Sequence, residues 1–595
     1  MTSIHVLPEA RVPDPAGPSE APVASGHRTH EVTNQSPPLV GHDVFGADAA
    51  LVETLARVVG DPGNPGNARD PGDTAAGMHE ADRARLGELA ELGRLAGSQQ
   101  AQTWADQANR FTPQLHTHDR FGHRVDEIEL HPAWHELMGV AVRHGLHAAP
   151  WREEGRHPHL LRAAGFYVWS QAEQGHGCPI SMTYAVVPAL RLQPELADRW
   201  EPLLAARSYS PGSQPPHTKP GVLAGMGMTE KQGGSDVRAN TTTATPDGSD
   251  GFRLTGHKWF TSAPMNDLFL VLAQAPGGLT CFLLPRVLPD GTLNSWRIQR
   301  LKDKLGNRSN PSGEVEMDQA WAQRVGPEGR GVATIIEMVA ATRLDTVLGS
   351  AALVRRALTE ASWHAAHRRA FGTVLADTPL MRSVLADLAV EAEAALALGL
   401  RLASAADAAA RGDEQARALR RIALPLSKYW VTKRAPTLVA EAMECLGGNG
   451  YVEESVLPRL LREAPVNSIW EGSGSVNALD LLRALGKEPA ALDAWLAEVG
   501  LARGADRHLD NAVQAVLALL ADMGDPSTAQ ASARRLAEQM ALVTQAALLV
   551  QHAPHCVADA FCAGRLGPGA TLTLGTLPRG LDLAGIVARA TPTLG

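Results

Sequence analysis

The spacing of the apolar residues changes twice along this chain of 595 residues. Up to about Leu203 the apolar residues recur at steps of three and four, which is typical of amphipathic helices. From about Val222 to Asp318, short apolar runs alternate with Pro, Gly and Asp turns, which predicts strands. Helical spacing then returns and continues over several long segments. The sequence therefore predicts an α+β protein, mostly α, with one β domain between helical domains.

These changes divide the chain into five parts. Residues 1–37 are rich in Pro, Ser and Gly with almost no apolar pattern, so we expect a disordered lead-in. We expect an N-terminal helical domain over 38–221, a middle β domain over 222–325 and a bundle of long helices over 326–487. Residues 488–595 are predicted to form an additional helical domain that ends in a tail rich in Gly, Pro and Thr.

The composition narrows the class of protein. With 44% hydrophobic and 20% charged residues the chain is ordinary for a soluble globular protein, and its net charge of −9 excludes a protein that is basic all over. No apolar run is long enough to span a membrane, and the N-terminus lacks the pattern of a secretory signal, so we expect a cytoplasmic protein. The five scattered cysteines predict reduced thiols and no metal site.

Three polar stretches that contain glycine are candidates for a binding site. They are MTEKQGGSD at Met228–Asp236, GHKWFTSA at Gly256–Ala263 and NSIWEGSGSVNALD at Asn467–Asp480. Turn chemistry explains any one of them, but it explains the three together poorly. Backbone N–H groups in a Gly/Ser loop that enters a helix suit an anion or the edge of a flavin ring.

In order along the chain, MTEKQGGSD, GHKWFTS, KDKLGNRSN, RRAFG, EAMECLGGNGY and IWEGSG resemble the acyl-CoA dehydrogenase flavoproteins. They resemble most the AidB-type branch, which is associated with the bacterial response to DNA alkylation. The resemblance is strong over roughly Pro37 to Lys487. It implies the acyl-CoA dehydrogenase fold, with an N-terminal helical domain, a β-barrel-like middle domain and a C-terminal four-helix bundle. It also implies a homotetramer that contains FAD.

The resemblance assigns the expected FAD contacts residue by residue. Thr229 and Ser235 would hydrogen-bond near the ring and the phosphates. Arg368 would reach the FAD of a neighbouring subunit, and the loop at Gly447 would bind the adenosine end. Glu444 stands where the family commonly has Gln. The expected contacts are Met226, Gly227, Met228, Thr229, Ser235, Phe260, Thr261, Ser262, Arg368, Phe371, Gly447, Gly448, Asn467, Trp470, Gly472, Ser473 and Asn477.

Glu471 of IWEGSG matches the usual catalytic base of the family. Removal of the proton α to a thioester carbonyl needs a base whose pKa is raised by an apolar site, beside a flavin that accepts the hydride. An alternative is that Glu471 only caps the following helix. Some members carry the base just before the arginine matched by Arg343. That position is Thr342 here, although Asp345 is close along the chain.

Three functions remain open at this point. The first is an FAD-containing AidB-like oxidoreductase of the CH–CH class, which acts in protection from or repair of alkylation damage. The second is a metabolic acyl-CoA dehydrogenase that oxidises a short or branched acyl-CoA with Glu471 as base. The third is a nucleic-acid-binding module in which the flavin is mostly structural. The sequence does not identify the substrate.

The resemblance links the C-terminal segment to double-stranded DNA. From Ala491 to Gly595 the chain has seven Arg, no Lys and nine acidic residues, a net charge of −2. Arg534 and Arg535, adjacent on a predicted helix, are the best candidates for phosphate contacts, although a solvated helix face explains them as well. We expect weak, sequence-independent duplex binding that falls steeply with salt.

Overall fold

The structure is a computed structural model that describes residues 32–60, 78–248 and 251–593. The expected lead-in at 1–37 lies outside these residues apart from 32–37. Those six residues run beside the end of a long helix, where Trp363 Nε1 donates a 2.8 Å hydrogen bond to the carbonyl of Pro37. None of the helices in the described ranges is long and apolar enough to cross a bilayer.

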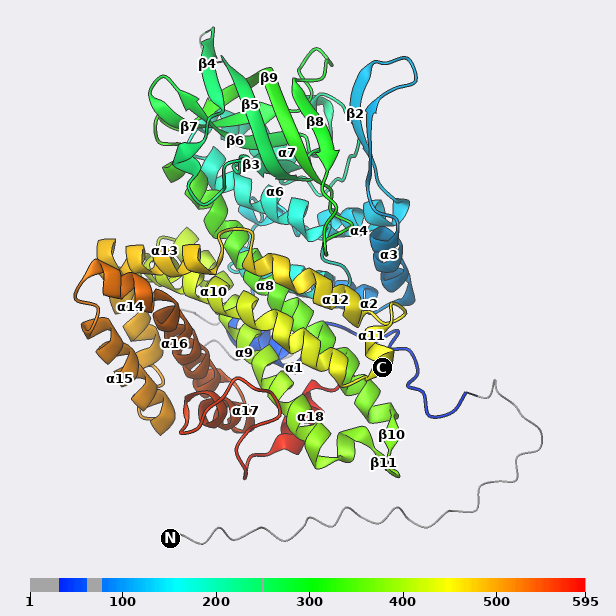
Figure 1. Cartoon of the computed structure of the whole chain (residues 1–595), viewed down its shortest axis with the longest axis vertical. Helices are drawn as coiled ribbons and strands as arrows, with labels where there is room; N and C mark the ends of the chain where they lie inside the picture. The colour runs from blue at the N-terminus through cyan, green and yellow to red at the C-terminus, as the bar shows by residue number, and fades with distance from the viewer. Residues whose placement is uncertain (1–31, 61–77, 249–250, 594–595) are drawn as a thin grey trace.

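The N-terminal region is helical, as expected, with one addition (Figure 1). Its helices are α1 (Ala49–Val58), α2 (Glu80–Ala96), α3 (Gln99–Arg110), α4 (Pro132–Arg143), α5 (Pro158–Ser170), α6 (Gly177–Leu190) and α7 (Pro194–Leu204). The addition is an antiparallel hairpin of β1 (Gln114–His118) and β2 (Arg124–Glu129) that helical spacing did not predict. Asp119 closes its turn by accepting bonds from the backbone of Phe121 and His123.

The middle region is a closed barrel, and the predicted β domain is confirmed. Its strands are β3 (Ala224–Gly227), β4 (Thr243–Asp247), β5 (Gly251–Ser262), β6 (Leu268–Ala275), β7 (Gly278–Pro285), β8 (Trp296–Leu301) and β9 (Ser312–Val325). β6 pairs with β4 and β7, and β9 pairs with β5 and β7, so the sheet closes on itself. β3 extends the edge of β6 in parallel. The strands β6 and β7 are buried on both faces, which explains their continuous apolar runs.

Four helices form the predicted bundle after the barrel. They are α8 (Gly331–His367), α9 (Pro379–Ala410), α10 (Glu414–Glu444) and α13 (Gly474–Lys487). The strands β10 (Arg369–Ala370) and β11 (Thr373–Val374) form a small turn that connects α8 to α9. Along the chain, α11 (Gly448–Tyr451) and α12 (Leu457–Glu463) come between α10 and α13. Leucine and alanine side chains from α8, α9 and α10 share one apolar core with the N-terminal helices. The acyl-CoA dehydrogenase fold is thus confirmed.

The additional helices pack onto this bundle. They are α14 (Pro489–Gly500), α15 (Arg507–Ala521), α16 (Pro526–His552), α17 (His555–Phe561) and α18 (Leu583–Ala590). The predicted Gly/Pro/Thr-rich tail therefore also contains a helix, α18. Its Arg589 pairs with Glu53 and Glu393, and the buried Arg565 pairs with Asp387 and Glu391. Two of the seven C-terminal arginines therefore serve the fold.

Candidate active site

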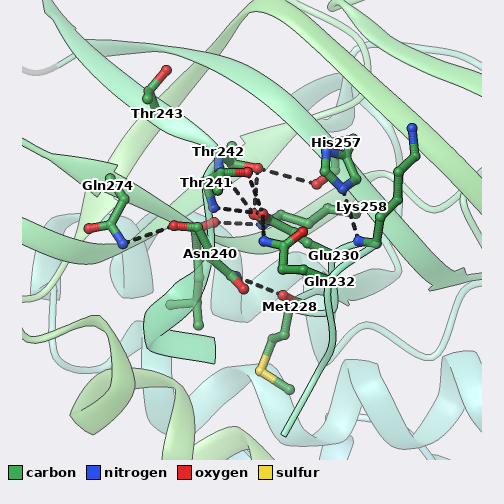
Figure 2. A network of polar contacts seen from close by, with 12 residues as sticks. Met228, Glu230, Gln232, Asn240, Thr241, Thr242, Thr243, His257, Lys258 and Gln274 are labelled. Carbon is green, nitrogen blue, oxygen red and sulfur yellow. Dashed lines mark hydrogen bonds and ion pairs between the residues drawn. The ribbon is translucent and has the colours of Figure 1, made fainter. Parts of the chain in front are cut away.

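Glu230, the acid of MTEKQGGSD, is completely buried and accepts hydrogen bonds from several groups (Figure 2). Its Oε1 lies 2.7 Å from Lys258 Nζ and 2.6 Å from the hydroxyl of Thr242. Its Oε2 accepts from the backbone N–H of Thr241 at 2.7 Å and from Gln232 Nε2 at 2.8 Å. Both oxygens have partners inside the protein, so Glu230 is a structural residue rather than a reacting one.

Lys258, from GHKWFTSA, is the cation of this network. Burial lowers the pKa of its ammonium to about 8, and Glu230 limits the fall. Burial would raise the pKa of Glu230, but Lys258 and the hydrogen bonds bring it down to about 2. Both groups are therefore ionised at neutral pH. Lys258 Nζ also donates a 2.8 Å bond to the carbonyl of Leu272 on β6, so the pair is anchored to the barrel.

Backbone contacts then fix the two polar stretches against each other. The backbone N–H of Trp259 donates to the carbonyl of Thr229 over 2.9 Å. The backbone N–H of Lys231 donates to His257 Nε2 over 2.9 Å. The ion pair and these bonds together bring MTEKQGGSD and GHKWFTSA side by side, as a shared binding surface requires.

The expected flavin contacts on these stretches include a polar atom without a hydrogen-bond partner and an exposed aromatic ring. Thr261 is fully buried, and its hydroxyl has no partner in the described part of the chain. Phe260 is 57% exposed, although it is a large apolar side chain. Gly234 must be glycine, because a Cβ there would lie 2.5 Å from Thr229 Oγ1. The remaining expected contacts on the same stretches are Met226, Gly227, Met228, Ser235 and Ser262. The exposed ring of Phe260 and the unpaired hydroxyl of Thr261 fit a flat, hydrogen-bonding group such as a flavin.

Glu471 lies in a strained loop before α13. Its φ is +56° and that of Gly472 is +95°, a conformation that residues other than glycine seldom adopt. Arg343 Nε donates to the carbonyl of Glu471 at 3.1 Å. Lys428 Nζ donates to the carbonyls of Trp470 at 2.8 Å and Gly472 at 2.5 Å. Two buried cations therefore hold this backbone in place.

The side chain of Glu471 does not cap a helix. The N-cap of α13 is Ser473, and Glu471 Oε2 instead accepts a 2.7 Å hydrogen bond from the hydroxyl of Thr342 on α8. Asn477 Nδ2 donates to the carbonyl of Gly472 at 2.6 Å, which ties the loop to the first turn of α13. The helix-cap alternative is therefore not supported.

Burial raises the pKa of Glu471, while the Thr342 hydroxyl, Lys428 and Arg343 act in the opposite direction. Burial also lowers the pKa of Lys428 to about 7, and the negative charge of Glu471 opposes this fall. Arg343 is paired with Asp480 at 2.5 Å, so its charge is already compensated. The carboxyl group therefore has a raised pKa, as a proton-accepting carboxylate needs.

Glu471 borders a small cavity with a volume of about 60 Å³. The cavity lies between α5, α6 and α8 and the loop that carries Glu471. Asn467 and Trp470, both expected flavin contacts, line it together with Thr342. Within the described ranges, no group of three or more His, Cys, Asp or Glu side chains is arranged to hold a metal ion.

A second group of the expected FAD contacts lies away from the barrel and the cavity. Arg368, Phe371, Gly447 and Gly448 sit around β10, β11 and α11, well away from the barrel (Figure 1). Asn34 bonds both the backbone N–H and the carbonyl of Arg369, so the N-terminal segment contacts this group. The side chain of Phe371 is fully exposed. The structure therefore divides the expected FAD contacts of one chain into two separate groups.

The two candidate DNA contacts are exposed on α16. Arg534 lies over the ring of Tyr429 at 5.7 Å, and its Nε donates a long 3.4 Å bond to the Tyr429 hydroxyl. Arg535 is also exposed. Neither residue lines the cavity at Glu471.

Sequence reasoning missed four residues of this site. Glu230 and Lys258 belong to MTEKQGGSD and GHKWFTSA, but the sequence did not predict that these two side chains form an ion pair. Thr342 was considered only as a missing base, not as the partner of Glu471. Lys428, inside α10, belongs to none of the motifs that the sequence analysis identified. A lysine at an inward position of β5 could have indicated a buried partner.

Three family models match successive parts of the chain. A model described as "Adaptive response protein AidB N-terminal domain" matches residues 34–211. The acyl-CoA dehydrogenase middle and C-terminal domains match residues 225–320 and 329–486. A protein of Escherichia coli K12 named "Putative acyl-CoA dehydrogenase AidB" is 42% identical over 537 residues, which is 90% of this chain and 94% of that protein. The chain belongs to the AidB branch of the acyl-CoA dehydrogenase family.

Two solved structures extend the comparison. Caenorhabditis elegans ACDH-11 in complex with C11-CoA has a TM-score of 0.80 at 27% identity, covering 92% of this chain and 95% of that one. An acyl-CoA dehydrogenase from Bacillus anthracis, complexed with FAD, has a TM-score of 0.61 at 18% identity, covering 87% and 85%. The expected family and enzyme class, an oxidoreductase acting on CH–CH donors, are confirmed.

Replacing Glu230 by Gln should weaken FAD binding by roughly tenfold or more, because it leaves Lys258 buried without a counter-charge. The measurement is the dissociation constant of FAD, followed by the recovery of flavin fluorescence on release. Lys231→Gln is the matched control, since the side chain of Lys231 is exposed in the same stretch and Glu230 forms its ion pair with Lys258 instead. Equal FAD affinity in the Glu230 variant and the control would show that the network does not support the flavin.

Proposed function

We propose that the protein is an FAD-containing oxidoreductase of the AidB type in which Glu471 removes the α-proton of an acyl thioester such as an acyl-CoA. The observation that carries this proposal is the carboxylate of Glu471, with a raised pKa, at the edge of a cavity. When bound, FAD supplies the acceptor for the hydride of the β carbon. The chain's own residues bind the thioester, orient it and take the proton.

The hydrogen bonds of Glu471 suit this task. Thr342 donates to Oε2 and so fixes the orientation of the carboxylate, while the described residues donate no hydrogen bond to Oε1. Arg343 and Lys428 hold the carbonyls before, at and after Glu471, so the strained loop keeps the carboxylate at the cavity. Thr342, Arg343 and Lys428 are therefore positioning residues for the base.

FAD would span two subunits. The stretches at Thr229 and Thr261 suit the ring, whereas Arg368 and the loop at Gly447 lie on a distant face of the same chain. A neighbouring subunit would therefore supply the second group, with the guanidinium of Arg368 contacting phosphate. The exposed apolar side chains Phe371, Leu380 and Tyr451 support an interface between copies. We propose a homotetramer, as in the family.

The proposed cellular role rests on the similarity to the AidB protein. We propose a cytoplasmic protein that acts in protection from or repair of DNA alkylation damage, supported by the similarity to the AidB protein of E. coli along nearly its whole length. Weak duplex binding through Arg534 and Arg535 is part of this proposal. A metabolic acyl-CoA dehydrogenase acting on short or branched acyl-CoA is the alternative, and rapid flavin reduction by such a thioester together with no binding of duplex DNA would favour it.

Glu471→Gln should retain FAD and lose at least about a thousandfold in the rate of flavin reduction, because the amide keeps the shape and removes the basic lone pair. The experiment is anaerobic mixing with a panel of acyl-CoAs, followed by loss of the oxidised flavin absorption. Glu154→Gln is a matched control, because Glu154 is an exposed residue that does not line the cavity. An unchanged rate in the Glu471 variant would exclude this residue as the base.

The pH dependence has a definite sign. Burial raises the pKa of Glu471, and the base acts only when it is deprotonated, so flavin reduction should be lost as the pH falls through this raised pKa. The rate of flavin reduction should rise as the pH passes through the raised pKa of Glu471, above the ordinary carboxyl range. At higher pH it should level off. Thr342→Val removes a bond to the charged form, so the midpoint should move to higher pH. A midpoint that stays in place would contradict the assignment.

Duplex binding is tested by titration at low salt. Arg534→Ala with Arg535→Ala should reduce the affinity for a labelled duplex several-fold and make its salt dependence less steep, because two phosphate contacts are lost. Arg503→Ala with Arg507→Ala is the matched control on the same domain. Absence of binding by the unaltered protein, or an affinity unchanged in the α16 variant, would remove this role from α16.

A further inference from the structure

A large cleft outside the candidate active site is bordered by α3, α8, α12 and the N-terminal segment at Pro38 and Leu39. Its volume is about 770 Å³, against about 60 Å³ for the cavity at Glu471, and small-molecule sites usually occupy about 300–1,000 Å³. Among the described residues, the lining of the cleft shares none with the cavity and includes none of the expected FAD contacts. The cleft is therefore a candidate site for a second ligand.

The lining of the cleft is mainly polar and rich in arginine. Five arginines and four acidic residues border it, and most of the other side chains are amides or hydroxyls. Three of the arginines have carboxylate partners within the lining, which are Arg110 with Asp106 at 3.2 Å, Arg356 with Glu360 at 2.6 Å and Arg462 with Glu453 at 2.5 Å. Arg308, Arg459 and the exposed Glu454 form no ion pair in the ranges that the structure describes. Positive charge therefore exceeds negative charge among the unpaired groups.

Arg459, on α12, carries a charge that no carboxylate neutralises by direct contact in the described chain. Burial lowers the pKa of its guanidinium, and Glu173 is the acid that opposes this fall most. Glu173 already accepts hydrogen bonds from other side chains on both of its oxygens. Arg459 Nη2 donates to the carbonyl of Ala172 at 3.0 Å, and within the described residues Nη1 has no partner. A partly buried guanidinium without a counter-charge is costly, so an anion in the cleft would stabilise it.

Arg308 extends from a loop in which the residues on either side of it are fixed. The backbone N–H of Asn307 donates to Glu463 at 2.5 Å, and the hydroxyl of Ser309 donates to Glu173 at 2.6 Å. Arg308 itself is exposed, and neither Nη1 nor Nη2 has a hydrogen-bond partner in the described part of the chain. The side chain therefore presents free donors from an ordered backbone, which lowers the entropic cost of binding.

Two observations place Arg308 and Arg459 close to one shared ion pair. The loop before Arg308 packs on α12, because a Cβ on Gly306 would lie 2.0 Å from the carbonyl oxygen of Arg462. Arg462, and with a smaller contribution Arg308, lower the pKa of Glu453. Arg459 precedes Arg462 by three residues on α12, so the two lie on the same face of this helix. The unpaired guanidiniums therefore lie on either side of the Arg462–Glu453 pair.

We infer that this cleft binds a polar organic anion, with Arg308 and Arg459 as the contacts for its phosphate or carboxylate group. A guanidinium binds such oxygens through two parallel N–H donors. The volume exceeds what an inorganic ion fills, and amide and hydroxyl side chains such as Gln99 and Thr103 suit polar groups on the rest of the ligand. This site is separate from the proposed dehydrogenase chemistry and does not depend on it.

The test is calorimetric titration of the FAD-loaded protein with anions and with their neutral counterparts. The pairs are AMP with adenosine, ribose 5-phosphate with ribose, and citrate with trimethyl citrate. At least one anion should bind about tenfold more tightly than its neutral counterpart, or better, because charge-assisted hydrogen bonds to the two arginines are absent from the neutral compound. Its affinity should fall with added salt. Preference for AMP or ribose 5-phosphate assigns a phosphate ligand, and preference for citrate assigns a carboxylate.

Variants assign the binding to this cleft. Arg308→Met and Arg459→Met should each weaken anion binding about tenfold and leave the neutral compounds unaffected. Glu454→Gln should tighten anion binding, because it removes the unpaired carboxylate of the lining. Arg83→Met is the matched control, since Arg83 is an exposed arginine on α2 that does not line the cleft. If Arg459→Met does not fold, the changes at the exposed Arg308 and Glu454 still decide.

Thermal unfolding distinguishes a ligand contact from a structural arginine. An anion that binds should raise the Tm of the unaltered FAD-loaded protein more than that of Arg308→Met, because a ligand of the native state stabilises it in proportion to its affinity. If Arg459→Met lowers the Tm without changing anion affinity, Arg459 only supports the Ala172 carbonyl and its assignment is overturned. No binding of any of the three anions up to roughly 10 mM, or equal anion affinity in Arg308→Met, Glu454→Gln and the control, would overturn the site.

Discussion

The buried ion pair between Glu230 and Lys258 is the interaction on which the candidate flavin site depends. It joins two stretches that are 28 positions apart in the sequence, and both stretches carry expected flavin contacts. A pair of this kind adds little net stability when compared with apolar residues of the same shape, but loss of one partner costs about 3–5 kcal/mol. Its value here is geometric, because Glu230 also fixes the backbone of Thr241 and Thr242.

A similar arrangement holds the base. Glu471 adopts a left-handed backbone conformation, which is unfavourable for a residue with a side chain. The buried cations Lys428 and Arg343 each bind carbonyls of the same loop, and Asp480 compensates Arg343. In both places a buried charge orders backbone of the candidate site, while the expected flavin contacts Thr261 and Trp470 keep a polar atom without a hydrogen-bond partner in the described chain.

The sequence predicted the order of domains well because apolar periodicity reports burial. Apolar periodicity predicts both the long helices and the barrel strands that are buried on both faces. The β1–β2 hairpin was missed because it is short and mostly exposed, with only Asp126 and Ile128 buried on β2. The α18 helix was missed because Gly, Pro and Thr precede and follow it. Its position depends on Arg589 and two distant acids, which local pattern cannot reveal.

The candidate site could be predicted in part. Glu471 and the flavin stretches were expected from residue type and order. Their partners were not, because Thr342 and Lys428 lie 129 and 43 positions away from Glu471 along the chain and meet it only in the folded bundle.

The most direct test of this account is a double-mutant cycle on FAD affinity with Glu230→Gln, Lys258→Met and the two changes combined. If the pair acts as one unit that orders both stretches, each single variant should bind FAD roughly tenfold more weakly or worse, and the double variant should be no weaker than the single ones. Effects that add independently, or FAD affinity unchanged in all three variants, would contradict the central role of this ion pair.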